Sequence, residues 1–348
     1  MPTATEALQC PQTGAPFERA TIDRRDPGPN DIEIEIKHCG ICHSDIHQVR
    51  GDWGAGIFPM VPGHEIVGVV ASVGGKVEGF AVGDRVGVGC FVDSCGECEH
   101  CENGEEQFCV KGVVSTYNDR DYDGETTYGG YSTSIVVKDH FVVRIPDGME
   151  LDVAAPLLCA GITTYSPLKR WGAGEGKRVA IVGMGGLGHV AVQIAKAMGA
   201  EVTVLSHSMS KEEDGRRFGA DAYYATADKE TFKALRGSFD LILNTVSANL
   251  PIDRYLSTLS VGGAMVNVGA PAEPDTFRAF SLLGGRRILA GSVVGGLPET
   301  QEMLDFCAEH GVEPQIERIT IDDVDGAYDR VADSSVRYRC VIDIGSFG

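Results

Sequence analysis

Hydrophobic residues follow two different periods along the chain. Over residues 1 to about 150 they alternate with polar residues, as at Ile32, Ile34 and Ile36, which glutamates separate. This alternation is the pattern of a half-buried strand. Turn-forming sequences such as Asp26-Pro27-Gly28-Pro29 separate such runs. This part is therefore predicted to be mostly β, with further strands over residues 65–73, 85–88, 130–137 and 141–145.

From about residue 155 the period changes, and short apolar runs alternate with helical stretches. Strands that alternate with helices predict a parallel, doubly wound sheet. The apolar runs are expected to be strands over residues 179–182, 202–205, 222–224, 240–246, 264–268 and 287–291. Beyond residue 295 we expect a helix over 298–309 and strand-like segments near 316–321 and 338–344. The predicted fold class is α/β.

A glycine turn follows the first of these parallel strands. The sequence G-x-G-G-x-G stands between the apolar run 178–182 and a helical apolar stripe that begins at Leu187 and ends before Gly199. Glycines at such a turn let backbone N–H groups approach a pyrophosphate, and the helix N-terminus favours its negative charge. The stretch predicts a dinucleotide site, with a plain structural turn as the alternative. The fingerprint glycines are Gly183, Gly185, Gly186 and Gly188.

Composition excludes several classes of protein. The 348 residues are 43% hydrophobic, enough for two domains with cores of their own. No apolar run is long enough to span a membrane and no signal peptide is visible, so a cytoplasmic protein is expected. The 50 acidic against 30 basic side chains argue against nucleic acid or an anionic membrane as a partner. The 11 cysteines favour metal or reactive sites over disulfides.

Four cysteines stand close together in the spacing C-x2-C-x2-C-x7-C. Four thiolates at such spacing can close a tetrahedral zinc site that has no open position. A closed site of this kind stabilises a lobe that has little core of its own. A zinc-ribbon that binds nucleic acid is the alternative, and the acidic balance weighs against it. The four residues are Cys95, Cys98, Cys101 and Cys109.

A second set of metal-ligand residues is dispersed along the chain. Cys42, His64 and Cys159 could hold zinc on three sides and leave a fourth position for a substrate oxygen. Each residue alone also fits an ordinary role, since a lone Cys159 among leucines is more often a small buried hydrophobe. The remaining cysteines lack such context and are expected to be ordinary: Cys10, Cys39, Cys90, Cys307 and Cys340.

These motifs together resemble the zinc-dependent medium-chain alcohol dehydrogenase superfamily. The segments CGICHSDIH, VPGHEIVG, GDRVGVGCFVDSCGECEHC, LLCAGITTY and VGMGGLGH occur in the family's order and cover essentially the whole chain. Together with GSVVGGLPETQEMLDFCAEHG they are most similar to the cinnamyl alcohol dehydrogenase-type branch and its bacterial aldehyde reductases. The resemblance implies a GroES-like catalytic domain over 1–154, a Rossmann NADP-binding domain over 155–294, and a return to the catalytic domain over 295–348.

The resemblance also implies roles for individual residues. It implies Cys42, His64 and Cys159 as ligands of a catalytic zinc, with Glu65 able to approach the metal, and the four clustered cysteines as a structural zinc site. Ser44 is expected to donate a proton to the reacting oxygen. His47 would relay a proton from solvent through the nicotinamide ribose. Asp45 is expected to hold the turn. Substrate would meet Trp53, Phe91 and Tyr117.

The residues after the second parallel strand predict the choice of cofactor. An NAD enzyme usually places Asp or Glu there, whereas this strand ends at Ser206, with hydroxyls and one lysine following. Such donors can bind a 2′-phosphate, although the serines could instead cap the next helix. We therefore expect NADP(H). The expected cofactor contacts, beyond the four glycines, are His43, Thr163, Leu187, Ser206, His207, Ser208, Lys211, Gly269, Ser292 and Val293.

The expected activity is the zinc-dependent, reversible reduction of aromatic or medium aliphatic aldehydes to primary alcohols with NADPH. Two alternatives stay open: a zinc-free quinone oxidoreductase of the same fold, and a non-enzymatic zinc-ribbon scaffold. Two zinc ions per chain would fit the dehydrogenase, none the quinone reductase and one the scaffold. A homodimer is expected from relatives in which the strand near residues 288–294 pairs with its copy.

Overall fold

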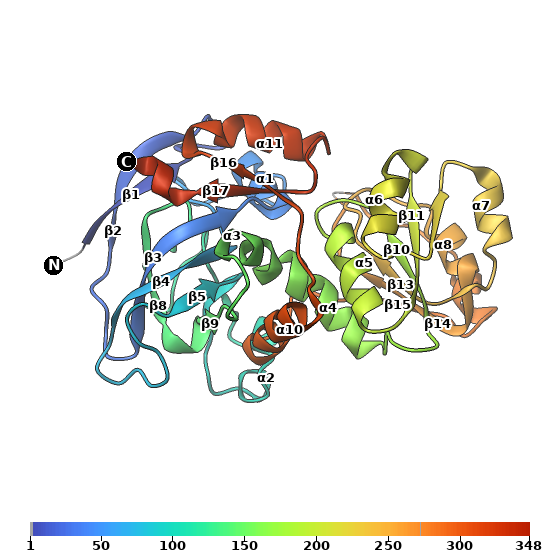
Figure 1. Ribbon diagram of the computed structural model, residues 1–348, viewed down its shortest axis with the longest axis horizontal. Coiled ribbons are helices and arrows are strands. Elements are labelled where there is room, and N and C mark those ends of the chain that lie inside the picture. Colours follow the sequence, from blue (N-terminus) through green and yellow to red (C-terminus); the bar gives the residue numbers. More distant parts are fainter. Residues whose placement is uncertain (1–2, 272) are drawn as a thin grey trace. The chain divides into compact units, whose positions relative to one another are not determined.

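The computed structural model describes residues 3–271 and 273–348, which form two compact units (Figure 1). The first unit comprises the described residues up to Cys159 together with Gly295–Ala308 and Pro314–Gly348. The second comprises Ala160–Val294 and Glu309–Glu313. Among the described residues, no helix combines the length and the apolar character that crossing a bilayer requires.

The first unit is built on a seven-stranded sheet with the order β16-β17-β3-β4-β5-β9, in which β8 also pairs with β3. The C-terminal strand β17 pairs antiparallel with β3, so the chain end returns to the sheet that the N-terminal part began (Figure 1). The strands are β1 (Thr3–Gln9), β2 (Glu18–Arg24), β3 (Asp31–Gly40), β4 (Ile66–Val73), β5 (Arg85–Val88), β6 (Phe91–Asp93), β7 (Val114–Ser115), β8 (Ser134–Lys138), β9 (Val143–Arg144), β16 (Ile316–Ile319) and β17 (Arg339–Asp343).

The first unit also contains several helical elements. Helix α1 follows β3 directly and begins at the residue after Cys42, which takes the N-cap position. The 3₁₀ turn η3 (Ala155–Leu158) leads to Cys159. The other helical elements are α2 (Glu99–Glu102), α3 (Leu151–Ala154), α10 (Leu297–His310), α11 (Val324–Ala332), η1 (Glu106–Phe108), η2 (Asp139–Phe141), η5 (Ile321–Asp323) and η6 (Ile344–Phe347), and α1 itself spans His43–Arg50.

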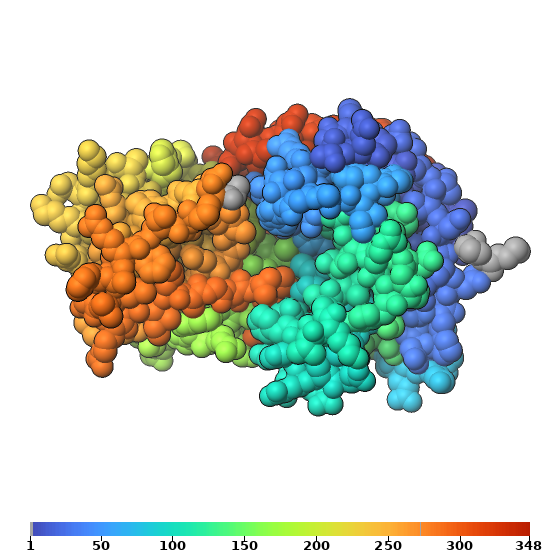
Figure 2. All heavy atoms as spheres, turned by 180° about the vertical axis from the view of Figure 1, so that it is seen from behind, coloured from blue at the N-terminus to red at the C-terminus, as the bar shows by residue number. Residues whose placement is uncertain are grey.

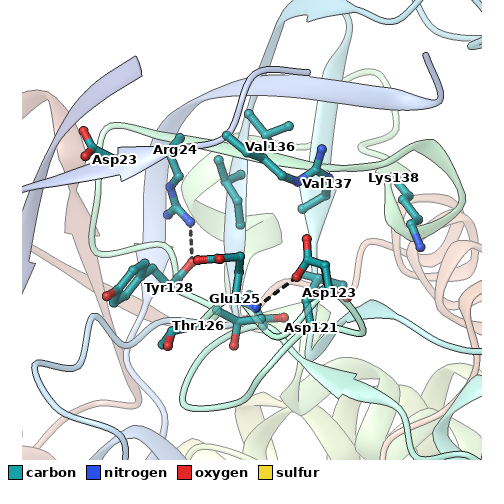
Figure 3. A pocket seen from close by; sticks show the side chains of 15 residues that line it. Asp23, Arg24, Asp121, Asp123, Glu125, Thr126, Tyr128, Val136, Val137 and Lys138 are labelled. Carbon is teal, nitrogen blue, oxygen red and sulfur yellow. Dashed lines mark hydrogen bonds between the residues drawn. The ribbon is translucent and has the colours of Figure 1, made fainter. Parts of the chain in front are cut away.

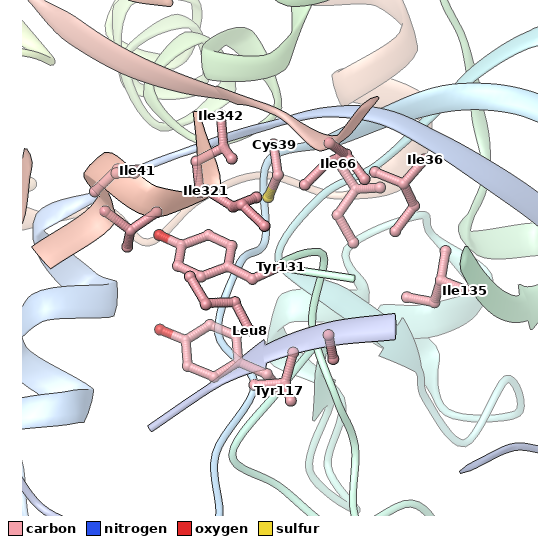
Figure 4. Packing of buried hydrophobic residues seen from close by; sticks show 14 of the residues in the cluster. Leu8, Ile36, Cys39, Ile41, Ile66, Tyr117, Tyr131, Ile135, Ile321 and Ile342 are labelled. Carbon is pink, nitrogen blue, oxygen red and sulfur yellow. The ribbon is translucent and has the colours of Figure 1, made fainter. Parts of the chain in front are cut away.

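The alternating isoleucines of β3 supply the core of the first unit. Ile32, Ile34 and Ile36 are buried, as their period of two predicts. They pack in one cluster with side chains from both chain ends, among them Leu8 and Ile342 (Figure 4). The core of this unit therefore requires the N-terminal and C-terminal segments together.

The second unit is a six-stranded sheet with all neighbouring strands parallel, in the order β12-β11-β10-β13-β14-β15. The six predicted parallel strands are confirmed, and the fold class is α/β with a doubly wound sheet, as expected. Its strands are β10 (Arg178–Val182), β11 (Glu201–Ser206), β12 (Ala222–Ala225), β13 (Phe239–Asn244), β14 (Leu259–Asn267) and β15 (Ile288–Gly291). Its helical elements are α4 (Ala160–Arg170), α5 (Gly188–Ala197), α6 (Glu212–Arg217), α7 (Lys229–Ala234), α8 (Ile252–Thr258), α9 (Ala279–Leu283) and η4 (Met209–Lys211).

Two predicted strands of the first unit are shorter than the sequence indicates. The run 130–137 becomes a strand only at Ser134, because Gly130 and Tyr131 donate backbone hydrogen bonds to Gly63 and Pro62 instead of to a sheet neighbour. The run 141–145 contains the end of η2 before β9. Both segments are largely buried, and burial alone does not make a strand.

Candidate active site and cofactor site

Three loops of the first unit bring four buried metal-ligand side chains together. Cys42 lies at the N-cap of α1, His64 and Glu65 directly precede β4, and Cys159 follows η3. One potential ligand atom from each of these four residues lies within 4.8 Å of all the others. The dispersed residues that the sequence singles out therefore form one cluster.

The distances within this cluster suit zinc. The sulfurs of Cys42 and Cys159 lie 3.8 Å apart, and His64 Nε2 lies 3.3 Å from Cys159 Sγ. Ligands of a tetrahedral zinc with bonds of about 2.0–2.3 Å stand about 3.3–3.8 Å from one another. Contact between the two thiols lowers the pKa of Cys42 well below its usual value and raises that of Cys159 well above it, so Cys42 is the more readily ionised member of the pair.

Asp45 holds the histidine of this cluster in position. Its Oδ1 accepts from His64 Nδ1 at 3.0 Å, and its Oδ2 accepts from the backbone N–H of Cys42 at 2.8 Å. The first contact leaves His64 Nε2 free to face the sulfurs, since a carboxylate on one ring nitrogen fixes the tautomer and the ring orientation. Asp45 holds the turn, as expected, and it also orients a ligand, which the sequence analysis missed.

Arg339 is a second residue that the sequence analysis missed. Its guanidinium forms a buried ion pair with Glu65, although the two residues are 274 positions apart. Burial raises the pKa of Glu65 to about 7, while the guanidinium acts in the opposite direction. Gly40 leaves the room for this carboxylate, because a Cβ there would stand 1.9 Å from Glu65 Oε2. No local pattern marks a single arginine near the chain end as part of this site.

The two residues proposed to move protons lie on one face of α1. Ser44 Oγ lies 3.6 Å from Cys42 Sγ, at the edge of the cluster of potential metal ligands. His47 Nδ1 lies 2.8 Å from Asp52 Oδ2, and the indole of Trp53 stacks on its ring with centroids 4.9 Å apart. Nε2 of His47 is buried and has no partner among the described residues. Asp52 thus holds the His47 ring at Nδ1, and Nε2 is left to take part in a further hydrogen bond.

The three predicted substrate-pocket residues have different surroundings. Trp53 is 49% exposed and Phe91, at the start of β6, is partly exposed. Tyr117 is only 5% exposed and belongs to the hydrophobic core (Figure 4). Its ring stacks on His64 with centroids 5.8 Å apart. The structure therefore places Tyr117 as a packing partner of His64. Cys90, expected to be an ordinary cysteine, contacts Cys159.

The second cysteine cluster forms the lobe around α2 and η1. The sulfurs of Cys95 and Cys101 lie 3.9 Å apart, and those of Cys98 and Cys101 lie 3.5 Å apart. One ligand atom of each of the four cysteines is within 4.8 Å of the others. Four sulfurs at tetrahedral spacing fit a closed zinc site without room for substrate. Burial raises the pKa of Cys101 to about 11, and backbone N–H groups lower that of Cys98 to about 6, so Cys98 is the more readily ionised of these two thiols.

The predicted cofactor residues of the second unit gather at the carboxyl ends of its parallel strands. The glycine turn follows β10, Ser206 ends β11, Gly269 follows β14, and Ser292 follows β15. Thr163 lies on α4 and is 8% exposed, and Val293 is 51% exposed. The remaining member, His43, is the first residue of α1 in the other unit. Ligands of doubly wound sheets bind at this edge of the sheet.

The glycine turn has the shape that a dinucleotide needs. Gly183 has a φ of +95°, and a Cβ on Gly188 would stand 2.1 Å from the Gly183 carbonyl oxygen. A Cβ on Gly185 would meet nothing within 4 Å, so the backbone is open there. Lys211 donates from Nζ to the Met184 carbonyl at 3.0 Å, which brings a cation to this turn. The turn therefore fits a pyrophosphate, with a positive charge beside it.

Ser208 has the capping role that the sequence left open as an alternative. Its hydroxyl accepts from the backbone N–H of Ser210 at the start of η4, whereas Ser206 lies at the strand end with its backbone carbonyl bound by Thr226. Ser206 is partly exposed at the strand end, and His207 and Ser208 are exposed beside it.

A pocket of about 240 Å³ in the first unit lies elsewhere (Figure 3). Its lining includes Arg24, Lys138, Asp121 and Asp123, and it contains none of the predicted site residues. Arg24 is buried and donates to the carbonyl oxygens of Tyr128, Gly129 and Ser134. Since its buried cation is satisfied within the fold, we place the chemistry in the cysteine–histidine cluster and not in this pocket.

Comparison with known proteins agrees with the geometry. Residues 28–147 match the alcohol dehydrogenase GroES-like domain, and residues 186–309 match the zinc-binding dehydrogenase family. The chain is 66% identical to the Probable formaldehyde dehydrogenase AdhA of Bacillus subtilis over 98% of both chains. It is 61% identical to the NADP-dependent alcohol dehydrogenase C 1 of Mycolicibacterium smegmatis over 95% of both.

A solved structure extends this similarity to the fold. The cinnamyl alcohol dehydrogenase from Sorghum bicolor is 43% identical, with a TM-score of 0.96 over 99% of this chain and 98% of that one. Both domains match family models, and the identities exceed 30% over nearly complete chains. The two clusters of potential metal ligands agree with these matches. The chain belongs to the zinc-dependent medium-chain alcohol dehydrogenase superfamily, in its cinnamyl alcohol dehydrogenase-type branch.

Proposed function

We propose that this protein is an NADP(H)-dependent zinc enzyme that reversibly reduces aldehydes to primary alcohols. The cluster of Cys42, His64 and Cys159 carries the proposal, because three protein ligands leave zinc a fourth position for a substrate oxygen. When bound, zinc would polarise the carbonyl oxygen and the nicotinamide would exchange hydride with the carbonyl carbon. The two thiolates would reduce the net positive charge of the zinc site, so the product oxygen is stabilised and can still dissociate.

The chain's own residues then position groups and move a proton. Asp45 keeps the His64 ring oriented, and the ion pair with Arg339 holds the Glu65 carboxylate beside the ligands. Ser44, at the edge of the cluster, donates its hydroxyl proton to the reacting oxygen in the reductive direction and removes it in the oxidative direction. Asp52 accepts from His47 Nδ1, so Nε2 can accept and release the relayed proton.

We propose aromatic and medium aliphatic aldehydes as the substrates. The half-exposed indole of Trp53 and the ring of Phe91 offer apolar surface in the same unit as the metal cluster. The similarity to a cinnamyl alcohol dehydrogenase supports the aromatic class, and that to a formaldehyde dehydrogenase supports aldehydes more widely. A panel from formaldehyde to cinnamaldehyde, assayed in both directions with NADPH and NADP⁺, tests this assignment. Turnover of quinones but of no aldehyde would contradict it.

The cofactor preference is a direct prediction from the β11 tip. We expect kcat/KM for NADPH to exceed that for NADH by at least about tenfold, a difference of about 1.4 kcal/mol. The tip carries Ser206 and no carboxylate, and Lys211 stands at the glycine turn. The NADP-dependence in the name of the mycobacterial relative supports this preference.

Ser206→Asp should reverse the cofactor preference by repelling the 2′-phosphate. Ser206→Ala, the matched control, should weaken NADPH use without favouring NADH. Equal use of both cofactors by the unmodified enzyme would refute the assignment.

We also propose a homodimer joined at the edge strand β15. Ile288 of this strand is exposed, and Val261, Phe280 and Leu283 of the same unit are 70%, 82% and 69% exposed. The segment lies on the surface of the second unit, drawn in orange in Figure 2. An apolar, β-branched edge strand is a ready template for pairing with its copy.

Light scattering at micromolar concentration should report twice the 37.0 kDa of one chain. Ile288→Lys should shift the protein toward the monomer, and a monomeric unmodified protein would exclude the dimer.

A further inference from the structure

A third cysteine lies against the catalytic pair. The thiol of Cys90 contacts that of Cys159, whose sulfur also lies 3.8 Å from Cys42 Sγ and 3.3 Å from His64 Nε2. Cys90 is not a member of the four-residue cluster in which every ligand atom is within 4.8 Å of the others. It therefore stands beside one proposed ligand without completing the metal's coordination shell.

The backbone keeps these two thiols next to each other. Gly89 approaches η3 so closely that a Cβ there would stand 3.0 Å from the Leu158 carbonyl oxygen. The residues that follow Gly89 and Leu158 are Cys90 and Cys159. Thr116 fixes the Gly89–Cys90 segment, since its hydroxyl donates to the Gly89 carbonyl at 2.6 Å and its N–H donates to the Cys90 carbonyl at 3.1 Å. These backbone contacts place the residues Cys90 and Cys159 next to each other.

The three cysteines differ in access to solvent. Cys42 and Cys159 are buried, with 3% and 8% of their surfaces exposed, whereas Cys90 is partly exposed. Of these three residues Cys90 is the most exposed, which favours it as the first target of a small oxidant. Oxidation of cysteine follows exposure, and a second thiol in contact captures the oxidised sulfur as a disulfide.

We propose that Cys90 is a peroxide-responsive thiol that forms a disulfide with Cys159 and thereby releases the catalytic zinc. The inference rests on the proposed function in one respect, because it takes Cys159 as a zinc ligand. It adds a reversible modification site that the alcohol dehydrogenase reaction does not itself use.

The chemistry balances with a hydroperoxide as the oxidant. The sulfur of Cys90 displaces one oxygen of hydrogen peroxide, forming a sulfenic acid and releasing water. The thiolate sulfur of Cys159 then attacks the Cys90 sulfur, the S–S bond forms, and the sulfenic oxygen takes a proton from solvent and leaves as a second water. Two cysteine sulfurs lose two electrons in total, and these reduce the O–O bond. Cys159 can then no longer serve as a thiolate ligand, and a thiol reductant with added zinc should reverse the change.

The test uses the purified zinc-loaded enzyme and hydrogen peroxide. Released zinc is followed with a chromogenic chelator, and disulfides are located by peptide mapping without reduction. We expect release of one zinc per chain together with a Cys90–Cys159 linkage, and release at least about tenfold slower from Cys90→Ser, which lacks the first sulfur. Cys10→Ser is the matched control. The Cys10 thiol donates to the carbonyls of Gln12 and Ala15, a serine hydroxyl can replace it, and release should match the wild type.

Several results would overturn the inference. These are zinc loss from Cys90→Ser at the wild-type rate, a Cys42–Cys159 linkage, or disulfides confined to the Cys95–Cys109 lobe. If Cys90→Ser lacks zinc before oxidation, Cys90→Ala is used, and peptide mapping of the wild type decides in either case. Zinc content and aldehyde turnover of the untreated enzyme test the proposed function separately, so the two ideas fail independently.

Discussion

Replacing Cys159 with serine is expected to abolish turnover and to remove one zinc per chain while the fold persists. Cys159 supplies the sulfur that lies within 4 Å of both Cys42 Sγ and His64 Nε2. A serine hydroxyl is a poor ligand for zinc in a thiolate site, and Lewis-acid stabilisation worth several kcal/mol corresponds to a loss of about 10³-fold or more. Zinc analysis, steady-state kinetics and thermal unfolding measure the three quantities.

Cys101→Ser provides the contrast for this result. Its sulfur lies 3.5 Å from Cys98 Sγ and 3.9 Å from Cys95 Sγ, in a lobe whose helical turns are only three and four residues long. A closed zinc site contributes folding free energy directly. This variant should therefore lower the unfolding temperature and promote aggregation, whereas Cys159→Ser should not. Full turnover by Cys159→Ser would disprove the catalytic-zinc assignment, and Cys10→Ser should behave as wild type in every assay.

The second large effect is expected at Ser44. Ser44→Ala should reduce kcat by about 10²–10⁴-fold, the usual contribution of a general acid or base. The hydroxyl lies 3.6 Å from Cys42 Sγ, next to the proposed zinc ligands. Ser44→Thr retains the hydroxyl and is the matched variant, expected to keep most of the activity. Steady-state kinetics with saturating NADPH measures the difference.

His47→Ala should cost much less than Ser44→Ala. The imidazole lies farther along the same helix, and water can partly replace a group that exchanges protons with solvent. Asp52→Asn should lower kcat more than a substitution of a surface residue that does not contact His47, because it replaces the acceptor of His47 Nδ1. Equal and negligible losses at Ser44 and His47 would rule out the proton relay.

Local spacing predicted the elements of this protein well. The alternation at Ile32, Ile34 and Ile36 predicted β3, and the strand, glycine turn and helical stripe between residues 178 and 199 predicted the dinucleotide fold. The structural cysteine cluster was equally accessible, because its ligands lie within 15 consecutive positions and local chain geometry brings them together. Strand period, turn glycines and short ligand spacings depend on neighbours in the chain, so the sequence alone carries them.

Contacts between distant segments were decided only by the tertiary structure. Cys42 and Cys159, 117 positions apart, could be joined from the sequence only through a family resemblance. No sequence pattern predicted three further contacts. These are the pairing of Arg339 with Glu65, the orientation of His64 by Asp45, and the contact of Cys90 with Cys159. The last depends on how closely Gly89 approaches Leu158. Such contacts arise from strand register and close backbone packing, which sum many weak interactions over the whole unit, and no single stretch of residues encodes them.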